Sequence, residues 1–309
     1  MLHYLLVMFN QLFSRRGLSL ERLKTLMEIQ HAGSIAKAAG GDPIRASLQS
    51  RQLRELAEFF GCELAAREGR NLRLTREGLR LADLTREFLL QMADFEASCQ
   101  KAHAGYSIAA GDSLIQWLVI PRIATIVDAL PEVRLGTFSM QTTEIVRQVN
   151  ESRIDVGLVR RTADTPGLHT APLGRLSYRL VIPLALLAGN PPPTIANIFA
   201  RFPMAMQISE GEFTTTLAQI ARRLAQGFRP GLECQSLPQV LSAVRSRRFV
   251  AVLPDIAIED LPARTFLVLK APELGPLERE ICLVWNPRVT KVRPYAQKLI
   301  DACRISLRF

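Results

Sequence analysis

The stretch from Ser34 to Gly78, SIAKAAGGDPIRASLQSRQLRELAEFFGCELAAREGRNLRLTREG, decides the fold of the amino-terminal part of this chain. Ser34 is a typical helix cap, and the two glycines at 40–41 end the short helix that it begins. Asp42-Pro43 then opens a longer helix, which the sequence predicts as far as Phe60. Two helices joined by a Gly-rich turn indicate a helix-turn-helix.

The segments on either side of these two helices complete a small domain. Before them, apolar residues recur at helical spacing between Leu20 and Ile29, with Ser19 as the cap and Gly33 as the stop. After them, the pattern of residues 64–75 predicts two short strands joined around Glu68-Gly69-Arg70-Asn71. We interpret this hairpin as the wing of a winged helix-turn-helix.

The predicted helix from Pro43 to Phe60 carries polar and cationic side chains opposite its apolar face. Such side chains bond to phosphates and to base edges in the major groove, and the alternative is an ordinary solvated helix face. Arginines of the wing could lie along phosphates or enter the minor groove. The candidate DNA-binding residues are Ser34, Arg45, Ser47, Gln49, Ser50, Arg51, Arg54, Arg67, Arg70 and Arg73.

The charge of the chain agrees with a polyanionic partner such as double-stranded DNA. The formal net charge of the 309 residues is +10. Between Ser14 and Arg80, 13 Lys or Arg stand against 8 Asp or Glu, so about half of the excess lies in roughly a fifth of the chain. This part of the sequence is therefore a basic module rather than a basic tail.

Neither the histidines nor the cysteines form a catalytic or metal-binding pattern. The 4 histidines lie outside any recognisable triad, and the sequence contains no HExxH, GxSxG, Walker loop or GxGxxG motif. The 5 cysteines are widely spaced and lack a CxxC pair, which predicts reduced, mostly buried thiols and leaves a redox-sensing thiol as the alternative. We therefore expect no enzyme activity, no metal and no cofactor.

The first 17 residues, MLHYLLVMFNQLFSRRG, have the wrong order for a secretory signal. Their positive charge follows the apolar run, which is also too short to span a bilayer. We expect either a packing extension or the product of a start codon upstream of Met8. Because no later apolar run reaches about 18 residues, the chain is expected to be cytoplasmic, with no membrane partner.

The stretch quoted above resembles the LysR-type transcriptional regulator family in the order and spacing of its residues. That family usually opens its recognition helix with Gln-Pro-Ala, whereas this chain has Ala46-Ser47-Leu48, so Arg45 or Gln49 could take over the contact of the absent glutamine. The matching residues are Ser34, Ala38-Ala39, Ser50, Leu53, Leu56, Gly61, Leu64, Arg67, Leu74-Thr75 and Gly78.

A long helix is predicted from Thr75 to near Gly105, with one apolar stripe. In the family that the chain resembles, this helix pairs between subunits. Dimerisation is therefore the favoured interpretation, and packing on the same chain alone is the alternative. The candidate dimerisation residues are Leu81, Leu84, Phe88, Met92 and Phe95.

From Tyr106 onward, predicted strands and helices alternate, which predicts a parallel sheet. This half resembles the effector domain of the same family, which has the two-lobed fold of type 2 periplasmic binding proteins. The resemblance implies that the chain crosses between lobes near residues 161–165 and 267–271. The matching residues are Pro121, Pro131-Glu132-Val133, Asp155-Val156-Gly157-Leu158, Gly167-Leu168, Pro172-Leu173-Gly174 and Leu253-Pro254.

The expected fold is thus α/β with an all-α winged helix-turn-helix head. We expect an amino-terminal extension at 1–17, a DNA-binding domain at 18–75, a linker or dimerisation helix at 76–104 and an effector-binding domain at 105–309. Within the last, lobe I covers about 105–162 and 270–309, and lobe II covers about 163–269.

A ligand in such a fold lies beyond the carboxyl ends of strands and beside helix amino termini. That rule selects Asp112, Ser113, Gln141, Thr142, Thr143, Arg160, Arg161, Ser209 and Thr214. Arg160 or Arg161 could bind an anionic effector through a carboxylate, the alternative being unpaired surface arginines. Where the family usually has Gly-x-Gly, this chain has Arg247-Arg248-Phe249, and these bulky residues could narrow the cleft.

The predicted function is a sequence-specific DNA-binding transcription regulator of LysR type, controlled by a small-molecule effector between the lobes. The resemblance implies a bacterial homodimer that assembles into a homotetramer and works with RNA polymerase. Two alternatives stay open: a regulator that has no effector, and a solute-binding protein with the same two-lobed fold.

Overall fold

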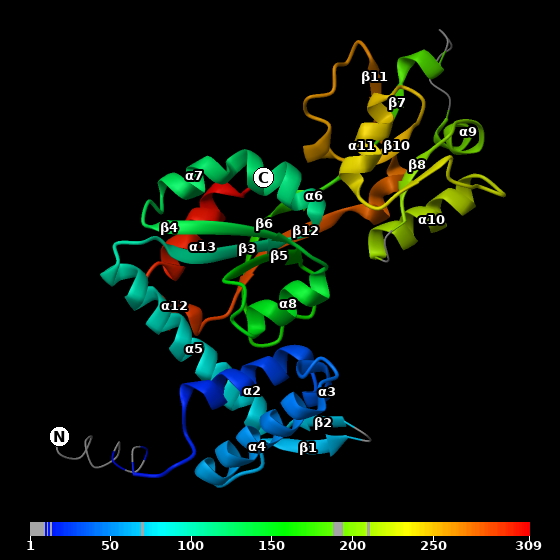
Figure 1. The fold of residues 1–309 in the computed structure, drawn as a ribbon. Coiled ribbons are helices and arrows are strands. Elements are labelled where there is room, and N and C mark those ends of the chain that lie inside the picture. Colours follow the sequence, from blue (N-terminus) through cyan, green and yellow to red (C-terminus); the bar gives the residue numbers. More distant parts are fainter. Residues whose placement is uncertain (1–9, 11, 13, 69–70, 188–193, 209–210) are drawn as a thin grey trace. The chain divides into compact units, whose positions relative to one another are not determined.

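A computed structural model describes residues 10, 12, 14–68, 71–187, 194–208 and 211–309. The chain divides into two compact units, residues 1–96 and 97–309 (Figure 1). Each unit has its own hydrophobic core. Within the described ranges, no helix is both long enough and apolar enough to cross a membrane.

The first unit begins with two helices whose caps are those that the sequence predicts. Helix α2 spans Leu20–Ala32, and the hydroxyl of Ser19 accepts a hydrogen bond from the backbone of Arg22. Helix α3 spans Ile35–Ala38, and Ser34 caps it by accepting from the backbone N–H of Lys37.

Helix α4 spans Pro43–Phe60 and follows a turn at Gly40 and Gly41. Both glycines have a positive φ, of 64° and 83°, which a residue with a side chain rarely adopts. The carboxylate of Asp42 accepts from two backbone N–H groups at the start of α4, and Gly61 ends the helix with a φ of 69°. The predicted bounds of this helix are therefore confirmed.

A two-stranded hairpin follows, formed by β1 (Ala65–Glu68) and β2 (Asn71–Leu74) in antiparallel register. It leads into the long helix α5, Arg76–Cys99. Gly78 lies so close to the backbone that a Cβ atom there would stand 2.1 Å from the carbonyl oxygen of Leu64. Only glycine permits this contact between α5 and the segment before β1.

The core of the first unit is a single cluster that joins every one of these elements. Leu26 and Ile29 of α2 meet Leu53 and Leu56 of α4, and all four are buried. Ile35, Leu64 and Ala82 complete the buried part of the cluster. The three-helix head therefore folds around the apolar faces that the helical spacing predicts.

The second unit is built on a five-stranded sheet in the order β4-β3-β5-β12-β6 (Figure 1). Strands β3, β4 and β5 are parallel, whereas β12 runs antiparallel to both β5 and β6. The strands are β3 Ala104–Ala110, β4 Val133–Ser139, β5 Val156–Arg160, β6 His169–Leu176 and β12 Arg279–Trp285. Of the five strands in this sheet, the sequence predicted the three parallel ones, so the expectation of a parallel sheet is correct for that part of the sheet.

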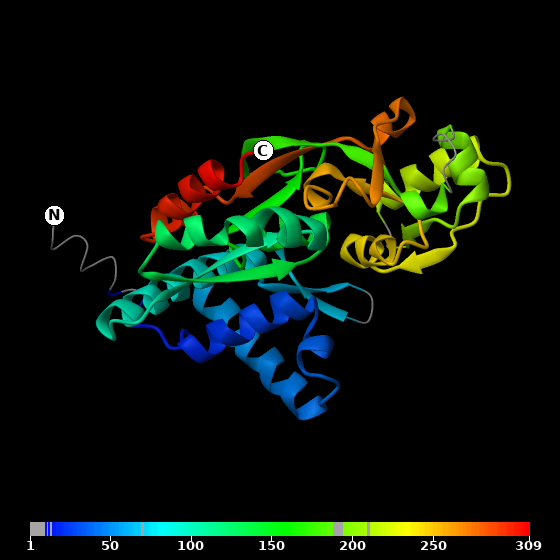
Figure 2. The same cartoon turned by 90° about the horizontal axis from the view of Figure 1, so that it is seen from above.

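Helices lie on the two faces of this sheet. Helix α13 packs beside α7, as Figure 2 shows. Helix α8 packs against strands β5, β12 and β3. The helical segments are α6 Asp112–Leu114, η1 Ile115–Val119, η2 Ile120–Arg122, α7 Ile123–Asp128, α8 Thr142–Asn150, α12 Val289–Val292 and α13 Ala296–Ser306.

The other lobe contains a three-stranded sheet, β10-β7-β11, and a parallel pair, β8 and β9. Its strands are β7 Tyr178–Pro183, β8 Ala205–Gln207, β9 Leu232–Cys234, β10 Ala251–Pro254 and β11 Phe266–Leu269. Its helical segments are η3 Leu184–Leu186, α9 Ile195–Arg201, α10 Glu212–Leu224, α11 Leu237–Arg245, η4 Asp255–Ala257 and η5 Pro272–Leu277.

The chain crosses between the lobes later than the sequence predicts. The expected first crossing, at 161–165, is wrong, because β6 still pairs with β12 in the five-stranded sheet. The chain crosses at Ser177, and it returns at Glu278, after η5 has packed on β7 and α10. The two crossings lie side by side: the hydroxyl of Ser177 donates to the carboxylate of Glu278 at 3.3 Å.

A buried ion pair ties the five-stranded sheet to the segment before α13. Arg293 donates to Asp155 at 2.6 Å, and its guanidinium lies 3.8 Å from the ring centre of Tyr106. The same carboxylate accepts from the backbone and from the hydroxyl of Ser107 on β3. Asp155 therefore has the hydrogen bonds that a buried charge requires.

Candidate nucleic-acid interface and interlobe cleft

Helix α4 presents an exposed cationic surface. The side chains of Arg45, Ser47, Arg51 and Arg54 are exposed on it, and Ser50 is half-buried beside them. Arg45 pairs with Glu28 of α2 at 3.4 Å, and Arg51 pairs with Glu55 one turn further along α4 at 3.9 Å. Exposed pairs of this kind are weak, so both guanidinium groups can exchange their partners for phosphates or base edges.

Gln49 does not lie on this surface, which corrects the expectation for it, and Gln52 is buried beside it. Gln49 is only 3% exposed and donates to Glu28 at 3.3 Å, whereas its Oε1 has no partner among the described residues. Gln52 accepts from the hydroxyl of Thr25 at 2.7 Å. The reason is helical spacing, because positions 49 and 52 share one face with the core residues 53 and 56.

Two apolar side chains of the exposed surface were missed in the sequence. Ile44 is 82% exposed in the first turn of α4, and Leu48 is exposed one turn later. They stand among Arg45, Ser47 and Arg51 on the helix. Apolar contacts with thymine methyl groups are one way in which proteins distinguish base pairs. The unusual exposure of an isoleucine is the signal, and it is apparent only in the folded protein.

Ser34 has a different position from the other candidates. Its side chain is buried, and its hydroxyl is used in the cap of α3. Ser34 therefore has a structural role as the cap of α3, the helix that precedes the turn before α4.

Two of the three wing arginines, Arg67 and Arg73, lie within the described residues. Arg67 is exposed at the end of β1, and Arg73 pairs with Glu68 across the hairpin at 2.6 Å. Arg70 lies outside the described residues.

The apolar stripe on α5 divides into two parts. Leu84, Phe88, Met92 and Phe95 are exposed. Leu81, which the sequence places on the same stripe, packs instead against the core of the head. An exposed row of large apolar side chains is characteristic of a surface that another protein covers.

A cleft of about 500 Å³ lies between the two lobes of the second unit. Six of the predicted effector residues line it: Asp112, Ser113, Gln141, Thr142, Thr143 and Arg160. Arg161 does not, because it is exposed and pairs with Glu280 at 2.7 Å. Thr214 is not among the lining residues either, and Ser209 lies outside the described residues.

The cleft also contains residues that no pattern along the chain singled out. Tyr178 and Phe213 stack with ring centres 4.8 Å apart, and Arg279 and Glu212 lie beside them. Burial raises the pKa of Tyr178 to about 12. Burial, and then the charge of Arg279, lower the pKa of Arg160. The run Ile281–Trp285 is apolar and could have revealed the strand that Arg279 begins.

Arg247 and Arg248 do not narrow the cleft, contrary to the expectation. Both are exposed, and neither lines it. Arg247 instead has a φ of 64° at the end of α11, the left-handed conformation that favours glycine. The departure from Gly-x-Gly therefore affects backbone strain rather than the space for a ligand.

The described residues contain no group of three or more His, Cys, Asp or Glu side chains arranged to hold a metal ion. All 5 cysteines are free thiols, two of them exposed and three buried. Burial raises the pKa of Cys303 to about 12, so this thiol stays protonated.

Comparison with known proteins gives two family matches that together cover most of the chain. Residues 20–79 match the bacterial regulatory helix-turn-helix proteins of the lysR family, and residues 100–308 match the LysR substrate binding domain. The curated HTH-type regulator MetR of Escherichia coli is 25% identical over 262 residues, covering 82% of this chain and 80% of MetR. The uncharacterized HTH-type regulator YnfL of Escherichia coli is 28% identical, but the match covers only 59% of this chain and 63% of YnfL.

Solved structures share the fold at low sequence identity. Full-length LysG from Corynebacterium glutamicum, described with bound effector Arg, has a TM-score of 0.63 and 16% identity, covering 94% of this chain and all of LysG. A full-length OxyR from Pseudomonas aeruginosa, in which one cysteine is replaced by aspartate, has a TM-score of 0.59 and 16% identity, covering 94% and 95%. Full-length CbnR in complex with its target DNA has a TM-score of 0.53 and 15% identity, covering 94% and 100%.

Proposed function

The chain belongs to the LysR family of bacterial transcriptional regulators, and on that premise we propose that it binds specific DNA sites through α4 and adjusts this binding to a small molecule held between its lobes. The family consists of regulators rather than enzymes. The proposed site of action is the chromosome, and the proposed location is accordingly the bacterial cytoplasm.

One observation carries the proposal for DNA binding. In the amino-terminal half of α4, the apolar and amide face packs on the rest of the head, and Ser47 and Arg51 are exposed on the opposite face. Arg45 is exposed in the first turn of the helix, beside Glu28 of α2. A helix of this kind after a tight turn fits the major groove with its amino-terminal residues at the base edges. Glu28, which pairs with Arg45 and accepts from Gln49, would hold Arg45 in place until DNA binds.

The wing and the rest of α4 would supply contacts to the phosphates. Arg67 is exposed on the wing, and Arg54 is exposed in the second half of α4. Contacts to phosphates add affinity that depends on salt but carry no sequence information directly. We assign base reading to Arg45, Ser47 and Arg51, and phosphate binding to Arg54, Arg67, Arg70 and Arg73.

The exposed stripe of α5 supports a dimer, in which two heads would read the two halves of a pseudo-palindromic site. Assembly into a tetramer and contact with RNA polymerase extend the proposal, and they rest on family membership alone. CbnR, which shares the fold, is described in complex with its target DNA.

The cleft supports the proposal of a small-molecule effector. Its volume of about 500 Å³ falls in the range of ligand pockets, and polar side chains line it from both lobes. LysG, which shares the fold, is described with a bound effector. A regulator without an effector is the second candidate, and nothing in the lining of the cleft favours it.

The proposal is tested by genome-wide capture of DNA with the purified protein, followed by a salt titration on the best fragment. We expect sites with dyad symmetry. Replacement R51A should change the preferred bases and cost about 1–3 kcal/mol on the cognate site, whereas R67A should weaken all sites alike and reduce the salt slope by about 1.

The matched control is R304A, which removes the same charge from an exposed arginine of α13. It should leave both the preferred bases and the salt slope unchanged. Equal, sequence-independent losses from R51A and R67A would remove α4 as the reading helix.

A further inference from the structure

Two guanidinium groups face the same part of the interlobe cleft. Arg160 ends β5 and Arg279 begins β12, and these neighbouring antiparallel strands pair Arg160 with Ile281. Both arginines line the cleft. Placing two like charges near each other, away from bulk water, is unfavourable unless an anion lies between or beside them.

Arg279 has an unused hydrogen-bonding group in this cleft. Its side chain is only 10% exposed. Its Nη1 donates to the carbonyl oxygens of Pro276 and Glu278, each at 2.9 Å, whereas its Nη2 has no hydrogen-bond acceptor among the described residues. A buried charged donor without an acceptor is costly, and an incoming acceptor would remove that cost.

A carboxylate of the protein itself already lies beside both arginines. Glu212 begins α10 on the other lobe, and its carboxylate forms an ion pair with Arg160. The same carboxylate is 3.7 Å from Nη2 of Arg279, too far for a hydrogen bond. Glu212 is half exposed, so its pairing is of the weak kind that a competing anion can replace.

An aromatic wall lies beside these charges. Tyr178 and Phe213 stack at an angle of 28° between their rings, and both line the cleft. Phe213 follows Glu212 directly in the sequence. A ligand that reaches the arginines therefore also contacts a flat apolar surface.

We infer that the cleft binds a small organic carboxylate with a flat apolar body, and that Glu212 occupies the position of the ligand's carboxylate when no ligand is present. This inference rests on the proposed function, because it names the chemical class of the effector. The ligand's carboxylate bridges Arg160 and Arg279 and supplies the acceptor that Nη2 of Arg279 lacks. Its apolar body lies against Tyr178 and Phe213.

Replacement of the Glu212 carboxylate by the ligand's carboxylate also removes an ion pair between the two lobes. Glu212 belongs to one lobe, and the strands that carry Arg160 and Arg279 belong to the other, so their ion pair spans the cleft. A ligand that takes the arginines releases Glu212 and α10. Binding of the carboxylate is thereby coupled to the spacing of the two lobes.

The test measures binding of phenylacetate and of its neutral counterpart phenylacetamide to the full-length protein by isothermal titration calorimetry. The variant E212Q removes the internal competitor and keeps the size of the side chain. We expect E212Q to bind phenylacetate at least about tenfold more tightly than the unsubstituted protein does. Phenylacetamide should bind at least about tenfold more weakly than phenylacetate, and R279Q should abolish the difference.

The matched control is E280Q, which removes one negative charge from the neighbouring residue of the same strand. Glu280 is paired with Arg161 and Arg175 outside the cleft, so E280Q should leave phenylacetate binding unchanged. Circular dichroism melting shows whether each variant is folded. R160K serves as a second variant, because it keeps the charge but loses the planar fork that holds a carboxylate.

Three outcomes would overturn the inference: no gain in E212Q, equal binding of acid and amide, or an equal gain in E280Q. The proposed function is tested separately, by the affinity of the captured DNA with and without phenylacetate. If phenylacetate binds as expected but DNA affinity does not change in E212Q, effector control is wrong while the carboxylate site stands. If DNA affinity responds equally to the amide, effector control stands and the carboxylate site is wrong.

Discussion

At the scale of single residues, Arg247 combines an ordinary charged side chain with an unusual backbone. Its side chain is exposed, as is usual for an arginine. Its positive φ nevertheless places it in a conformation that costs a residue with a Cβ atom about 1–2 kcal/mol. The sequence drew attention to this position for another reason, namely the absent Gly-x-Gly pattern.

Replacing this arginine by glycine should therefore stabilise the protein. We expect R247G to raise the free energy of unfolding by about 1 kcal/mol, measured by urea denaturation, because the gain from the relieved φ exceeds the entropic penalty of glycine. The control is R248G at the next residue, which has no positive φ and should destabilise by about 0.5–1 kcal/mol. Equal effects of the two substitutions would show that the strain at position 247 is absent.

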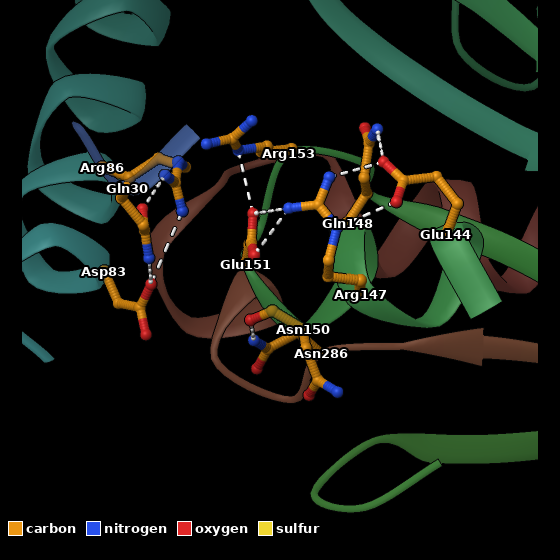
Figure 3. Close-up of polar contacts among 10 residues, drawn as sticks. All are labelled: Gln30, Asp83, Arg86, Glu144, Arg147, Gln148, Asn150, Glu151, Arg153 and Asn286. Atoms are coloured by element: carbon orange, nitrogen blue, oxygen red, sulfur yellow. Dashed lines mark hydrogen bonds and ion pairs between the residues drawn. The ribbon is translucent and has the colours of Figure 1, made fainter. Parts of the chain in front are cut away.

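Protonation of Glu144 should account for part of the stability that the protein loses at acidic pH. Hydrogen bonds from Arg147 and then from Gln148, with the charge of Arg147, hold the pKa of Glu144 at about 2, against burial, which acts in the opposite direction (Figure 3). A lowered pKa means that the carboxylate stabilises the fold above about pH 4.5 and that this contribution is lost as the pH falls toward 2.

We therefore expect E144Q to be less stable than the unsubstituted protein at neutral pH, by under about 1 kcal/mol because the cluster is open to solvent. The difference should shrink between pH 4.5 and about 2. Denaturant unfolding at a series of pH values measures it. E132Q, an exposed glutamate before β4, is the control, and a difference that does not depend on pH would contradict the assignment.

At the scale of elements, local signals in the sequence predicted the head well. Caps such as Ser19 and Asp42, the glycine stops and the apolar spacing of α2 and α4 are all contained in a few neighbouring residues. Strand β6 was missed because it contains Pro172, which argues against a strand except at the edge of a sheet, where β6 lies. Without β6, the crossing between lobes could not be placed.

The cleft was predicted only in part for a similar reason. Asp112, Gln141 and Arg160 follow or end predicted strands, so the rule for α/β sheets found them. Arg279 and Glu212 enter the same space from segments far apart in the sequence. No spacing along the chain relates them, and tertiary structure alone brings them together.

The long helix α5 gives the prediction at this scale. F88E places a charge in the middle of the exposed apolar row and should weaken self-association at least about tenfold, as measured by analytical ultracentrifugation. A93E adds the same charge to an exposed position on the opposite face of the same helix and should have little effect. If F88E and L84E both associate as tightly as the unsubstituted protein, α5 is not the dimer interface.

At the scale of the whole molecule, the two units rest on separate cores, and the larger one includes a buried ion pair. Asp155 and Arg293 are each 6% exposed. The pair joins β3 and the segment before β5 to the carboxyl-terminal segment, so it connects parts of the chain that are distant in sequence. Removing one partner leaves the other charge buried and uncompensated.

Replacement R293M should therefore destabilise the second unit by about 3–5 kcal/mol. The control is R304M, which breaks an exposed pair with Asp301 and should cost under about 1 kcal/mol. Differential scanning calorimetry would measure both changes. Similar losses of stability in the two variants would mean that the buried ion pair stabilises the protein no more than the exposed pair does.

The two crossings between the lobes have a mechanical consequence. Leu176 pairs with Arg279, so the first crossing segment lies directly beside the second. Two adjacent strands that connect two rigid bodies define a pivot, and displacement grows with distance from it. Arg279 begins β12 directly after the second crossing, so a small rotation about these two segments would move the far ends of the lobes by a larger distance. We therefore expect the size of any such rotation to depend on the lengths of the lobes, and its direction to depend on the few residues of the two crossings.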